Sequence, residues 1–421
     1  MAYSPEVSHL PDDRGAYRER LRLIATARSS IVLATYSVQA GPEVTAILDA
    51  LIAKAKQGVA VCFKFDAERE FAFGASEDIK ALRPKFRELE AAGGGVFGYG
   101  MGQQVASFGS GDHIKGLIVD GKTAIVGGRN FGVKHFNGTY GDYDVEVGGS
   151  AAPEYAAALF HTLQHAPLFH DSPEVPSSAA QSAHAHALLD RVHFDYSAAN
   201  RSARSNERML LDRGRSPGTR LAILTWDPTF DRRAAGASEH PNAITQAFIE
   251  TIDRAQSEII LNCNSFNPGE QTVAAICRAA RRGVKVHILT ASPTGAGISP
   301  LPYFNAMRIY PQLIGAGVHI WESQRYQHEK LFVVDNALAV VGSYNFEPAA
   351  EEKLKEQSTF SADPSWVKNI RSFLVKTLTD ECKPYTPQPE KLSFWHILFF
   401  PFWKLFVWLE KELAYAMRTQ F

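Results

Sequence analysis

One short pattern that combines a histidine, a lysine and an asparagine occurs twice in the chain. The first copy begins at His113 in HIKGLIVDGKTAIVGGRNFG, and the second begins at His328 in HEKLFVVDNALAVVGSYNFE. Histidine can attack a substrate or move a proton, while lysine and asparagine can bind the oxygens of an anion. A histidine beside an ammonium group suits attack on a phosphate that the cation holds. The pattern therefore predicts phosphoryl chemistry.

Both copies keep the same spacing, His-x-Lys-x4-Asp, with Gly-[Gly/Ser]-x-Asn seven residues after the aspartate. The positions are His113, Lys115, Asp120, Gly127, Gly128 and Asn130 in the first copy, and His328, Lys330, Asp335, Gly342, Ser343 and Asn345 in the second. A lone His-x-Lys carries no information, but two complete copies are specific. We predict that the two lysines and two asparagines bind one phosphate between them, and we expect neither a metal nor a cofactor.

The residues between the polar positions predict how the pattern folds. The runs LFVV and ALAVV are apolar and end at turn residues, which indicates two buried strands joined by a tight turn. A histidine and a lysine two residues apart on a strand point to the same face. Asp120 and Asp335 stand beside the turns, and we interpret them as structural residues that fix the hairpin. Gly128 and Ser343 let the backbone approach closely, and a phosphate contact from Ser343 is the alternative.

The duplication extends beyond the two motifs. The stretch 27–66 matches the stretch 255–290, and each gives a strand, a helical pattern, a Gly-Val break and a second strand. This βαβ order predicts a parallel or mixed sheet covered by helices, and its repetition predicts two fused halves. We expect an N-terminal half at 1–165, a connection at 166–220 and a C-terminal half at 221–385.

At this point the sequence resembles the phospholipase D superfamily, whose members carry two such motifs and build one active site from both. The phrases IVGGRNFG, RGVKVHILT and VVGSYNFEP look most like bacterial members of the cardiolipin-synthase type. The resemblance implies an α/β fold of two halves related by a pseudo-twofold axis, each a mixed sheet flanked by helices, with one shared active site. It also implies a phosphohistidine intermediate, with His113 as the nucleophile and His328 as the acid and base.

The resemblance further implies a carboxylate about thirty residues past each histidine that orients its ring. Asp142 in DYDV fits this role toward His113. Glu356, twenty-eight residues past the second motif histidine, is the candidate of the C-terminal half. Glu351 and Glu352 are nearby competitors for that role. A strand cap or an exposed charged turn is the alternative interpretation of these carboxylates.

Bulk composition restricts the function classes. The 421 residues are 45% hydrophobic and 21% charged, which is typical of a soluble globular protein. The formal net charge of −1 provides no overall basic field for nucleic acid. The four cysteines form no C-x-x-C pair, so we expect buried free thiols in a reducing compartment. His184, His186 and His193 lack the cysteine or carboxylate pattern of a metal site.

The C-terminal segment 386–421 is rich in tryptophan and phenylalanine. Its apolar run from Phe394 to Leu409 is interrupted by Pro401 and Lys404 and is shorter than the roughly 20 apolar residues of a spanning helix. Such a segment suits a helix in the membrane interface, and a helix packed on the second half is the alternative. No apolar signal core occurs at the N-terminus. We expect a peripheral protein on the cytoplasmic face of the bacterial inner membrane.

Three functions are consistent with these patterns. The first is hydrolysis of a phospholipid phosphodiester or transfer of its phosphatidyl group, by a monomer with an internally duplicated site. The second is a nuclease or phosphodiesterase acting on nucleic acid, and the third is a non-catalytic scaffold. One departure concerns the acceptor: Glu347-Pro348-Ala349-Ala350 stands where the cardiolipin-synthase type usually has Asp-Pro-Arg-Ser. Simple hydrolysis therefore stays open beside transfer.

Overall fold

The computed structural model describes residues 7–67, 76–99, 111–149, 152, 155–156, 159, 179–192, 221–226, 241–293, 295, 303 and 306–386. The predicted membrane-interface run, residues 394–409, lies outside these residues, as does His193. Of the expected connection 166–220, residues 179–192 are described.

The first half is built around a mixed sheet. Its elements are β1 (Val7–Leu10), α1 (Asp13–Thr26), β2 (Ser30–Ala34), β3 (Val38–Gln39), α2 (Pro42–Lys56), β4 (Ala60–Asp66), α4 (Glu77–Ala91), β5 (Gly95–Tyr99), β6 (Gly111–Asp112), β7 (Gly116–Val119), β8 (Thr123–Gly127), β9 (Phe131–Gly132), the 3-10 helix η1 (Val133–His135) and β10 (Asp144–Gly148). The strand order is β1-β10-β8-β7-β2-β4-β5. Strands β2, β4 and β5 pair in parallel, and the others pair antiparallel.

The second half repeats this arrangement. After α6 (Ala179–Arg191), its elements are β11 (Leu221–Trp226), α8 (Ala243–Asp253), β12 (Glu258–Asn262), α9 (Glu270–Arg281), β13 (Lys285–Ala291), α11 (Tyr310–Gly315), β14 (His319–Ser323), β15 (Leu331–Val334), β16 (Leu338–Gly342), α12 (Pro348–Glu352), β17 (Leu354–Ser361), α13 (Pro364–Glu381) and β18 (Cys382–Pro384). The order β11-β17-β16-β15-β12-β13-β14 matches the first sheet strand for strand, with β18 added at the edge. The predicted fold of two duplicated α/β halves is confirmed.

Local sequence explains where the helices lie, and α4 is an example. The Ser76 side chain accepts a hydrogen bond from the backbone N–H of Ile79 and so caps the helix start. The buried residues Ile79, Leu82, Phe86 and Leu89 repeat at helical spacing and face the sheet. Gly93 follows the helix with φ of 89°, a left-handed conformation that ends helices and favours glycine.

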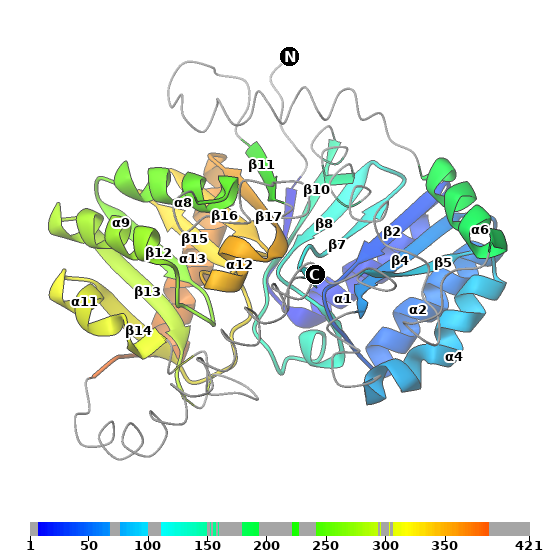
Figure 1. Cartoon of the computed structure of the whole chain (residues 1–421), viewed down its shortest axis with the longest axis horizontal. Helices are drawn as coiled ribbons and strands as arrows, with labels where there is room; N and C mark the ends of the chain where they lie inside the picture. Colours follow the sequence, from blue (N-terminus) through cyan, green and yellow to red (C-terminus); the bar gives the residue numbers. More distant parts are fainter. Residues whose placement is uncertain are drawn as a thin grey trace, which may run out of the picture.

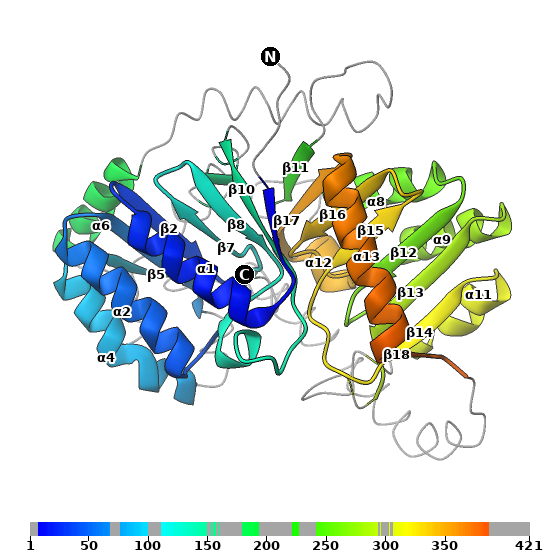
Figure 2. The ribbon, with the colours of Figure 1, turned by 180° about the vertical axis from the view of Figure 1, so that it is seen from behind.

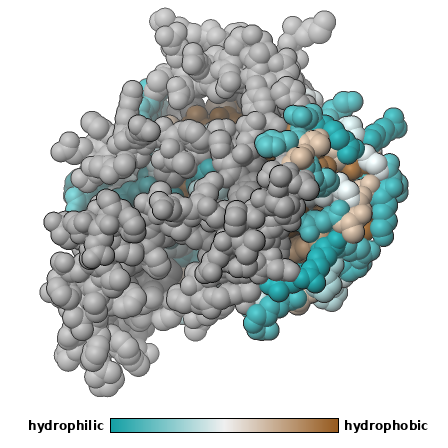
Figure 3. All heavy atoms as spheres, turned by 45° about the vertical axis from the view of Figure 1, so that its right-hand side comes forward, coloured by the Kyte–Doolittle hydropathy of each residue, from teal (hydrophilic) through white to brown (hydrophobic). Residues whose placement is uncertain are grey.

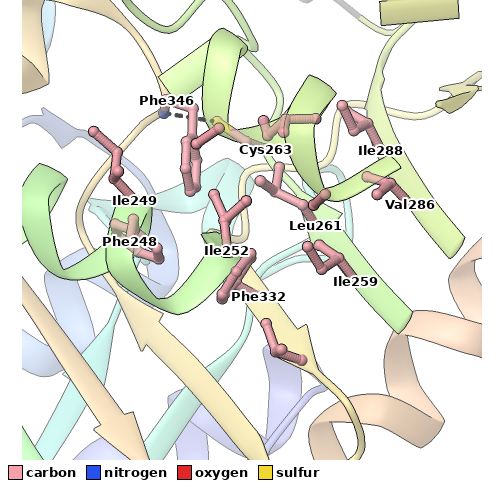
Figure 4. Packing of buried hydrophobic residues seen from close by; sticks show 14 of the residues in the cluster. Phe248, Ile249, Ile252, Ile259, Leu261, Cys263, Val286, Ile288, Phe332 and Phe346 are labelled. Carbon is pink, nitrogen blue, oxygen red and sulfur yellow. Dashed lines mark hydrogen bonds between the residues drawn. The ribbon is translucent and has the colours of Figure 1, made fainter. Parts of the chain in front are cut away.

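Helices cover the outer face of each sheet. Figure 1 shows the halves side by side with α8 and α9 over the second sheet, and Figure 2 shows α1, α2 and α4 over the first sheet from the opposite side. In the second half, Phe248 and Ile252 of α8 pack against Leu261 of β12 and Phe332 of β15, as Figure 4 shows. Burial of these large apolar side chains is the main force that holds helix and sheet together.

The two halves share a core between their inner faces. One continuous cluster of buried residues combines Ile118 and Val145 of the first sheet with Leu331 and Val341 of the second. Trp366 of α13 is fully buried in the same cluster. Because this cluster crosses the boundary, the halves are held in one orientation, which a site shared between them requires.

The described part of the connection, α6, buries one face and exposes the other. Leu188 and Val192, in and just after α6, are buried in the core cluster that the first half contributes to.

The four cysteines carry free thiols, three of them buried, as expected. The described surface visible in Figure 3 is mainly hydrophilic, with small apolar patches. Within the described residues, no helix has the length and apolar character needed to cross a membrane.

Candidate active site

The motif aspartates tie each hairpin to the start of a neighbouring strand. Asp120 has φ of 54° at the β7–β8 turn, and its carboxylate accepts hydrogen bonds from the backbone N–H groups of residues 28, 29 and 30. Asp335 has the same φ at the β15–β16 turn and accepts from residues 256, 257 and 258. These hydrogen bonds lower the pKa of both carboxyls against the effect of burial. The structure thus places both aspartates away from the histidines, in a structural position.

The histidine and lysine of each motif lie immediately before the first hairpin strand, and all four side chains are buried. The Nζ atom of Lys115 donates to the carbonyl oxygen of His113 at 2.5 Å. Lys330 makes the same hydrogen bond to the carbonyl oxygen of His328. The two motifs therefore have the same local conformation, as the repeated spacing predicts.

Backbone hydrogen bonds join each histidine to the opposite half. Strand β6 pairs with the first residues of β17, and the N–H of His113 donates to the carbonyl of Lys355 at 3.0 Å. A parallel bridge joins Gly141 to the residue before His328, and the N–H of His328 donates to the carbonyl of Gly141 at 2.6 Å. Both motifs are thereby held at the boundary between the halves.

The carboxylates pair with the histidines across that boundary. Oε1 of Glu356 lies 2.9 Å from Nδ1 of His113, and Oδ1 of Asp142 lies 2.9 Å from Nδ1 of His328. The predicted pairing of Asp142 with His113 is therefore wrong. Within each half, one strand lies between the strand after the histidine and the strand nearest the carboxylate. In the first half, β8 separates β7 from β10, which begins two residues after Asp142. In the second half, β16 separates β15 from β17, which carries Glu356. Two inter-strand spacings are about 10 Å, which exceeds hydrogen-bond reach.

The second oxygen of each carboxylate has its own donor, and the two donors differ. Oε2 of Glu356 accepts from the hydroxyl of Ser343. Oδ2 of Asp142 lies 2.5 Å from Nδ1 of His135, the last residue of η1. A contact with phosphate is the alternative interpretation of Ser343. In the structure, its hydroxyl is hydrogen-bonded to a carboxylate. His135 was missed from the sequence, because it lies outside the repeated motif and has no counterpart in the second copy.

Both motif lysines, Lys115 and Lys330, are buried. Burial lowers the pKa of Lys330. Burial, followed by the positive charge of Lys330, lowers the pKa of Lys115 well below its ordinary value. A negative charge near Lys115 and Lys330 would favour the protonated form of both lysines.

The two carboxylates differ in proton affinity. Burial raises the pKa of Glu356 to about 7, although Lys115 and Ser343 act in the opposite direction. Burial also acts to raise the pKa of Asp142, but the imidazoles of His135 and His328 outweigh it and hold that pKa well below its ordinary value. The pseudo-symmetric positions therefore hold one carboxylate that is ionised at neutral pH and one that titrates near it.

The two motif asparagines are held differently. Oδ1 of Asn130 accepts from the backbone N–H of Ser37 at 3.4 Å. The thiol of Cys263 donates to Oδ1 of Asn345 at 3.8 Å, and burial raises the pKa of this thiol to about 12. Nδ2 of Asn345 donates to Glu347 at 3.0 Å, so that carboxylate competes with phosphate for the donor. Figure 4 shows that Cys263 also accepts from the N–H of the next residue, Phe346, at 3.4 Å.

Among the described residues, one group of potential metal ligands is close enough to surround an ion. Its ligand atoms, on His135, Asp142 and His328, all lie within 4.8 Å of one another. The hydrogen bonds of 2.5 Å and 2.9 Å to the carboxylate account for this proximity, so we interpret the group as hydrogen-bonded. His184 lies elsewhere, and its Nε2 is 3.0 Å from the carbonyl oxygen of Gly94.

Sequence comparison places this arrangement among known proteins. The model of one family, described as "Cardiolipin synthase, PLD-like domain", matches residues 21–158 and 248–376, well over half of the chain. Cardiolipin synthase B of Escherichia coli (strain K12) is 24% identical over 272 residues, which are 64% of this chain and 56% of that protein. The probable cardiolipin synthase YwiE of Bacillus subtilis (strain 168) is 23% identical over 338 residues, 80% of this chain and 59% of that protein. The chain spans little more than half the length of these relatives.

Solved structures share the fold. Phosphatidylserine synthase from Haemophilus influenzae Rd KW20 has a TM-score of 0.68 at 14% identity, covering 98% of this chain and 96% of that chain. Polyphosphate kinase from Porphyromonas gingivalis has a TM-score of 0.54 at 14% identity, covering 90% of this chain and 48% of that chain. At this level of identity, the similarity shows the fold alone and does not identify a substrate.

Proposed function

Because the chain belongs to the family of cardiolipin-synthase, phospholipase D-like domains, we propose that it cleaves a phospholipid phosphodiester and transfers the phosphatidyl group to an alcohol or to water. One observation carries the proposal: two buried lysines accompany two histidines, and each histidine is held by a carboxylate from the opposite half. Phosphoryl transfer needs charge neutralisation, a nucleophile and an acid, and this arrangement supplies all three.

The substrate class rests on the relatives. The similar proteins are named as cardiolipin synthases, and the structural neighbour that matches nearly the whole chain is named as a phosphatidylserine synthase. Both names describe enzymes of phospholipid synthesis. The net charge of −1 argues against nucleic acid as the alternative substrate.

In the first step, Nε2 of His113 attacks phosphorus while the P–O bond to the leaving alcohol breaks. His328 gives the proton on its Nε2 to that alcohol. Lys115 and Lys330 neutralise the phosphoryl oxygens, and the amide of Asn130 adds a hydrogen bond. The products of this step are a phosphatidyl group bonded to His113, a neutral alcohol and a neutral His328.

In the second step, His328 accepts the proton of an acceptor alcohol or water as its oxygen attacks phosphorus. The P–N bond to His113 breaks, its electron pair returns to the imidazole, and the phosphatidyl group leaves on its new oxygen. Both histidines then have their starting protonation states, so the cycle is balanced and needs no further reactant.

The carboxylates support this division of roles. Asp142 stays ionised, and an ionised partner stabilises the imidazolium that His328 must form as the acid. Burial and the charge of Lys330 lower the pKa of His328 well below its ordinary value, against Asp142. An anionic phosphodiester beside Lys330 offsets that lysine's effect, so substrate binding favours the protonated acid. Glu356, with its raised pKa, suits a partner that stays neutral, as the nucleophile His113 does before attack.

The proposal includes three further parts. We propose that the chemistry proceeds without a metal, since the lysines already supply the positive charge that a metal ion would bring. The aromatic segment 386–421 would hold the protein at a membrane surface, on the cytoplasmic face, where its substrate lies. Glu347 and the three residues after it replace the family's Asp-Pro-Arg-Ser. This replacement would alter which acceptor, an alcohol or water, receives the phosphatidyl group.

Product analysis tests the proposal. The protein is incubated with phosphatidylglycerol vesicles, with and without a short-chain alcohol, and the lipids are identified by mass. Cardiolipin or the phosphatidyl ester of the alcohol is the expected result for transfer, and phosphatidic acid alone is the result for hydrolysis. Absence of any new lipid, together with cleavage of single-stranded DNA by the same preparation, would contradict the proposal in favour of a nuclease.

A further inference from the structure

A second histidine completes a three-residue chain behind His328. The carboxylate of Asp142 lies between two imidazoles, with Nδ1 of His328 at 2.9 Å from one oxygen and Nδ1 of His135 at 2.5 Å from the other. The ring centroids of the two histidines are 4.9 Å apart, at an interplanar angle of 73°. An ionised carboxylate can only accept hydrogen bonds, so both Nδ1 atoms must carry protons.

The ring of His135 is fixed from several sides. Its side chain is 3% exposed, and the ring packs edge-on against Tyr140, with the centroids 4.9 Å apart. Nη1 of Arg129 donates to the carbonyl oxygen of His135. A Cβ atom at Gly132 would lie 3.1 Å from Cδ2 of this ring, so the glycine provides the space it occupies. The ring therefore has a defined place and a defined contact.

The second half holds its carboxylate by a different residue. There, the Ser343 hydroxyl donates to Glu356. The counterpart of Ser343 in the first half is Gly128, where a Cβ atom would already lie 3.1 Å from Cδ of Lys330. A serine at this position would require the side chain of Lys330 to shift, and His135 supplies the second donor from a separate segment. The pseudo-symmetry of the site is thus broken at this contact.

The difference matters because an imidazole is a stronger electrostatic partner than a hydroxyl. Asp142 is buried and keeps its negative charge against that burial through the two histidines. Arg129 lies 3.9 Å from the same carboxylate, and it donates hydrogen bonds to Asp13, to Asp144 and to the carbonyl oxygen of His135. Without His135, one oxygen of a buried carboxylate would lack its 2.5 Å donor.

Other charged groups face this chain of three residues from the surrounding elements. They lie on α1, in the loop before β9 and in the segment before β15, and are Asp13, Arg20, Arg129, Arg325, Glu329 and Lys330. None of their hydrogen bonds described above replaces the contact of His135 with Oδ2 of Asp142. Burial raises the pKa of Glu329 to about 7, so this nearby group also titrates close to neutral pH. Because Glu329 is present in every variant, each variant's pH profile is compared with that of the unchanged protein.

We propose that His135 is a positioning residue that keeps Asp142 ionised and directed at His328, and so distinguishes the acid–base histidine from the nucleophilic one. This inference rests on the proposed function, but its geometry does not depend on the identity of the lipid. Its hydrogen bond fixes the carboxylate, the carboxylate fixes His328 with the proton on Nδ1, and Nε2 of His328 is left for the substrate.

Two substitutions separate positioning from packing. His135→Ala removes the donor, and His135→Asn retains an N–H close to the former Nδ1 position. His319→Ala, at an exposed histidine of β14, is the matched control. The chromogenic diester bis(p-nitrophenyl) phosphate needs no acid in its first step, so its turnover depends on His328 as the base of the second step. With this substrate, His135→Ala is expected to lower kcat about 10- to 100-fold. Asn is expected to restore most of the loss, while the control stays at the unchanged rate.

The pH profile supplies the decisive readout. Loss of the imidazole raises the pKa of Asp142, so its negative charge is lost at a higher pH as the solution is acidified. The acidic limb of kcat is therefore expected to move to higher pH in His135→Ala and to return toward its original place in His135→Asn. An unmoved limb in His135→Ala, or equal losses in the Ala and Asn variants, would overturn the proposal.

Nitrogen-15 NMR of the histidine rings tests the same contact without turnover. His328, assigned by its loss in His328→Ala, is expected to show a proton on Nδ1 that exchanges faster in His135→Ala. If the unchanged protein cleaves neither lipid nor diester, the proposed function fails while this spectrum still tests the contact. Stoichiometric binding of Zn²⁺ that His135→Ala abolishes, with the metal required for activity, would make the three residues a metal site and overturn the proposal.

Discussion

Oε1 of Glu356 lies 2.9 Å from Nδ1 of His113, although 243 positions separate the two residues in the chain. The matching contact, between Asp142 and His328, crosses the same boundary in the other direction. Neither half therefore contains both a motif histidine and the carboxylate that pairs with it. The site exists only when the two halves are correctly docked, which links catalysis to the shared apolar core.

Thermodynamic coupling tests this cross-half pairing. In a double-mutant cycle on unfolding free energy, His113→Ala and Glu356→Ala are expected to be non-additive by about 0.5–3 kcal/mol, because the residues are in contact. The cycle of His113→Ala with Asp142→Ala is the control and is expected to be additive within about 0.5 kcal/mol. If His113 were coupled to Asp142 and not to Glu356, this result would contradict the cross-half pairing and would show that His113 pairs with the carboxylate of its own half.

The sequence was sufficient for the fold, because the fold follows from local patterns. The apolar runs and the repeated strand–helix–strand stretch predict the two α/β halves, and the resemblance to the phospholipase D superfamily is confirmed by the family match. The motif histidines pair with Glu356 and Asp142 where the halves meet. Glu351, a competitor of Glu356, instead accepts from the backbone N–H of Gly269 at 3.0 Å.

The partners could not be predicted, because they depend on contacts between distant segments. The pairing of each carboxylate is decided by strand order and by the β6–β17 bridge, neither of which has a local signal. His135 has no counterpart in the repeat, so comparison of the two motifs could not reveal it. Asn345 and Glu347 are neighbours in sequence, yet their hydrogen bond depends on how the chain turns after β16.

The two carboxylates are expected to affect stability in opposite directions. Folding raises the pKa of Glu356 from 4.5 to about 7, so its contribution is present at low pH and is lost as pH rises through about 7. Glu356→Gln should therefore raise the unfolding free energy near about pH 8, by up to roughly 3 kcal/mol, with a smaller gain near about pH 5. Thermal unfolding at both pH values measures this, and a variant less stable at the higher pH would contradict it.

Asp142→Asn is the matched comparison. Folding lowers the pKa of Asp142, so its contribution is present above the ordinary pKa and is lost as pH falls through the folded value. The asparagine variant should be less stable than the unchanged protein at neutral pH, and the difference should shrink on strong acidification. A stabilising effect near neutral pH, like that expected for Glu356→Gln, would show that the two carboxylates are equivalent.

The turn aspartates should matter for folding and little for chemistry. Asp335→Ala removes a carboxylate that accepts three backbone hydrogen bonds, and it is expected to lower stability by about 2–4 kcal/mol. The rate per folded molecule should be unchanged, because Asp335 does not contact the histidines. Asp380→Ala, at an exposed position near the end of α13, is the control. A large loss of kcat in a fully folded Asp335→Ala protein would assign this residue to the chemistry.

Removal of metals should leave the rate unchanged, because the lysines supply the charge that neutralises phosphate. The protein is dialysed against a chelator, its metal content is measured, and turnover of the soluble diester is compared with that of the untreated sample. Loss of activity that Zn²⁺ or Mg²⁺ restores would contradict the metal-free account.

Deletion of residues 393–421 tests the membrane proposal, since these residues carry the aromatic segment. Binding to phospholipid vesicles, measured by co-sedimentation, is expected to fall, while turnover of a short-chain soluble substrate stays close to that of the full chain. Equal losses in both assays would indicate that the segment packs on the second half instead.

The most direct test of the central claim, one site with two histidines in separate roles, is to trap the covalent intermediate. A labelled phosphodiester with a p-nitrophenol leaving group needs no acid in the first step, so His328→Ala is expected to accumulate label on the peptide that contains His113. His113→Ala should accumulate none. Label on His328 in the His113→Ala protein, or no adduct in either variant while turnover persists, would contradict the account.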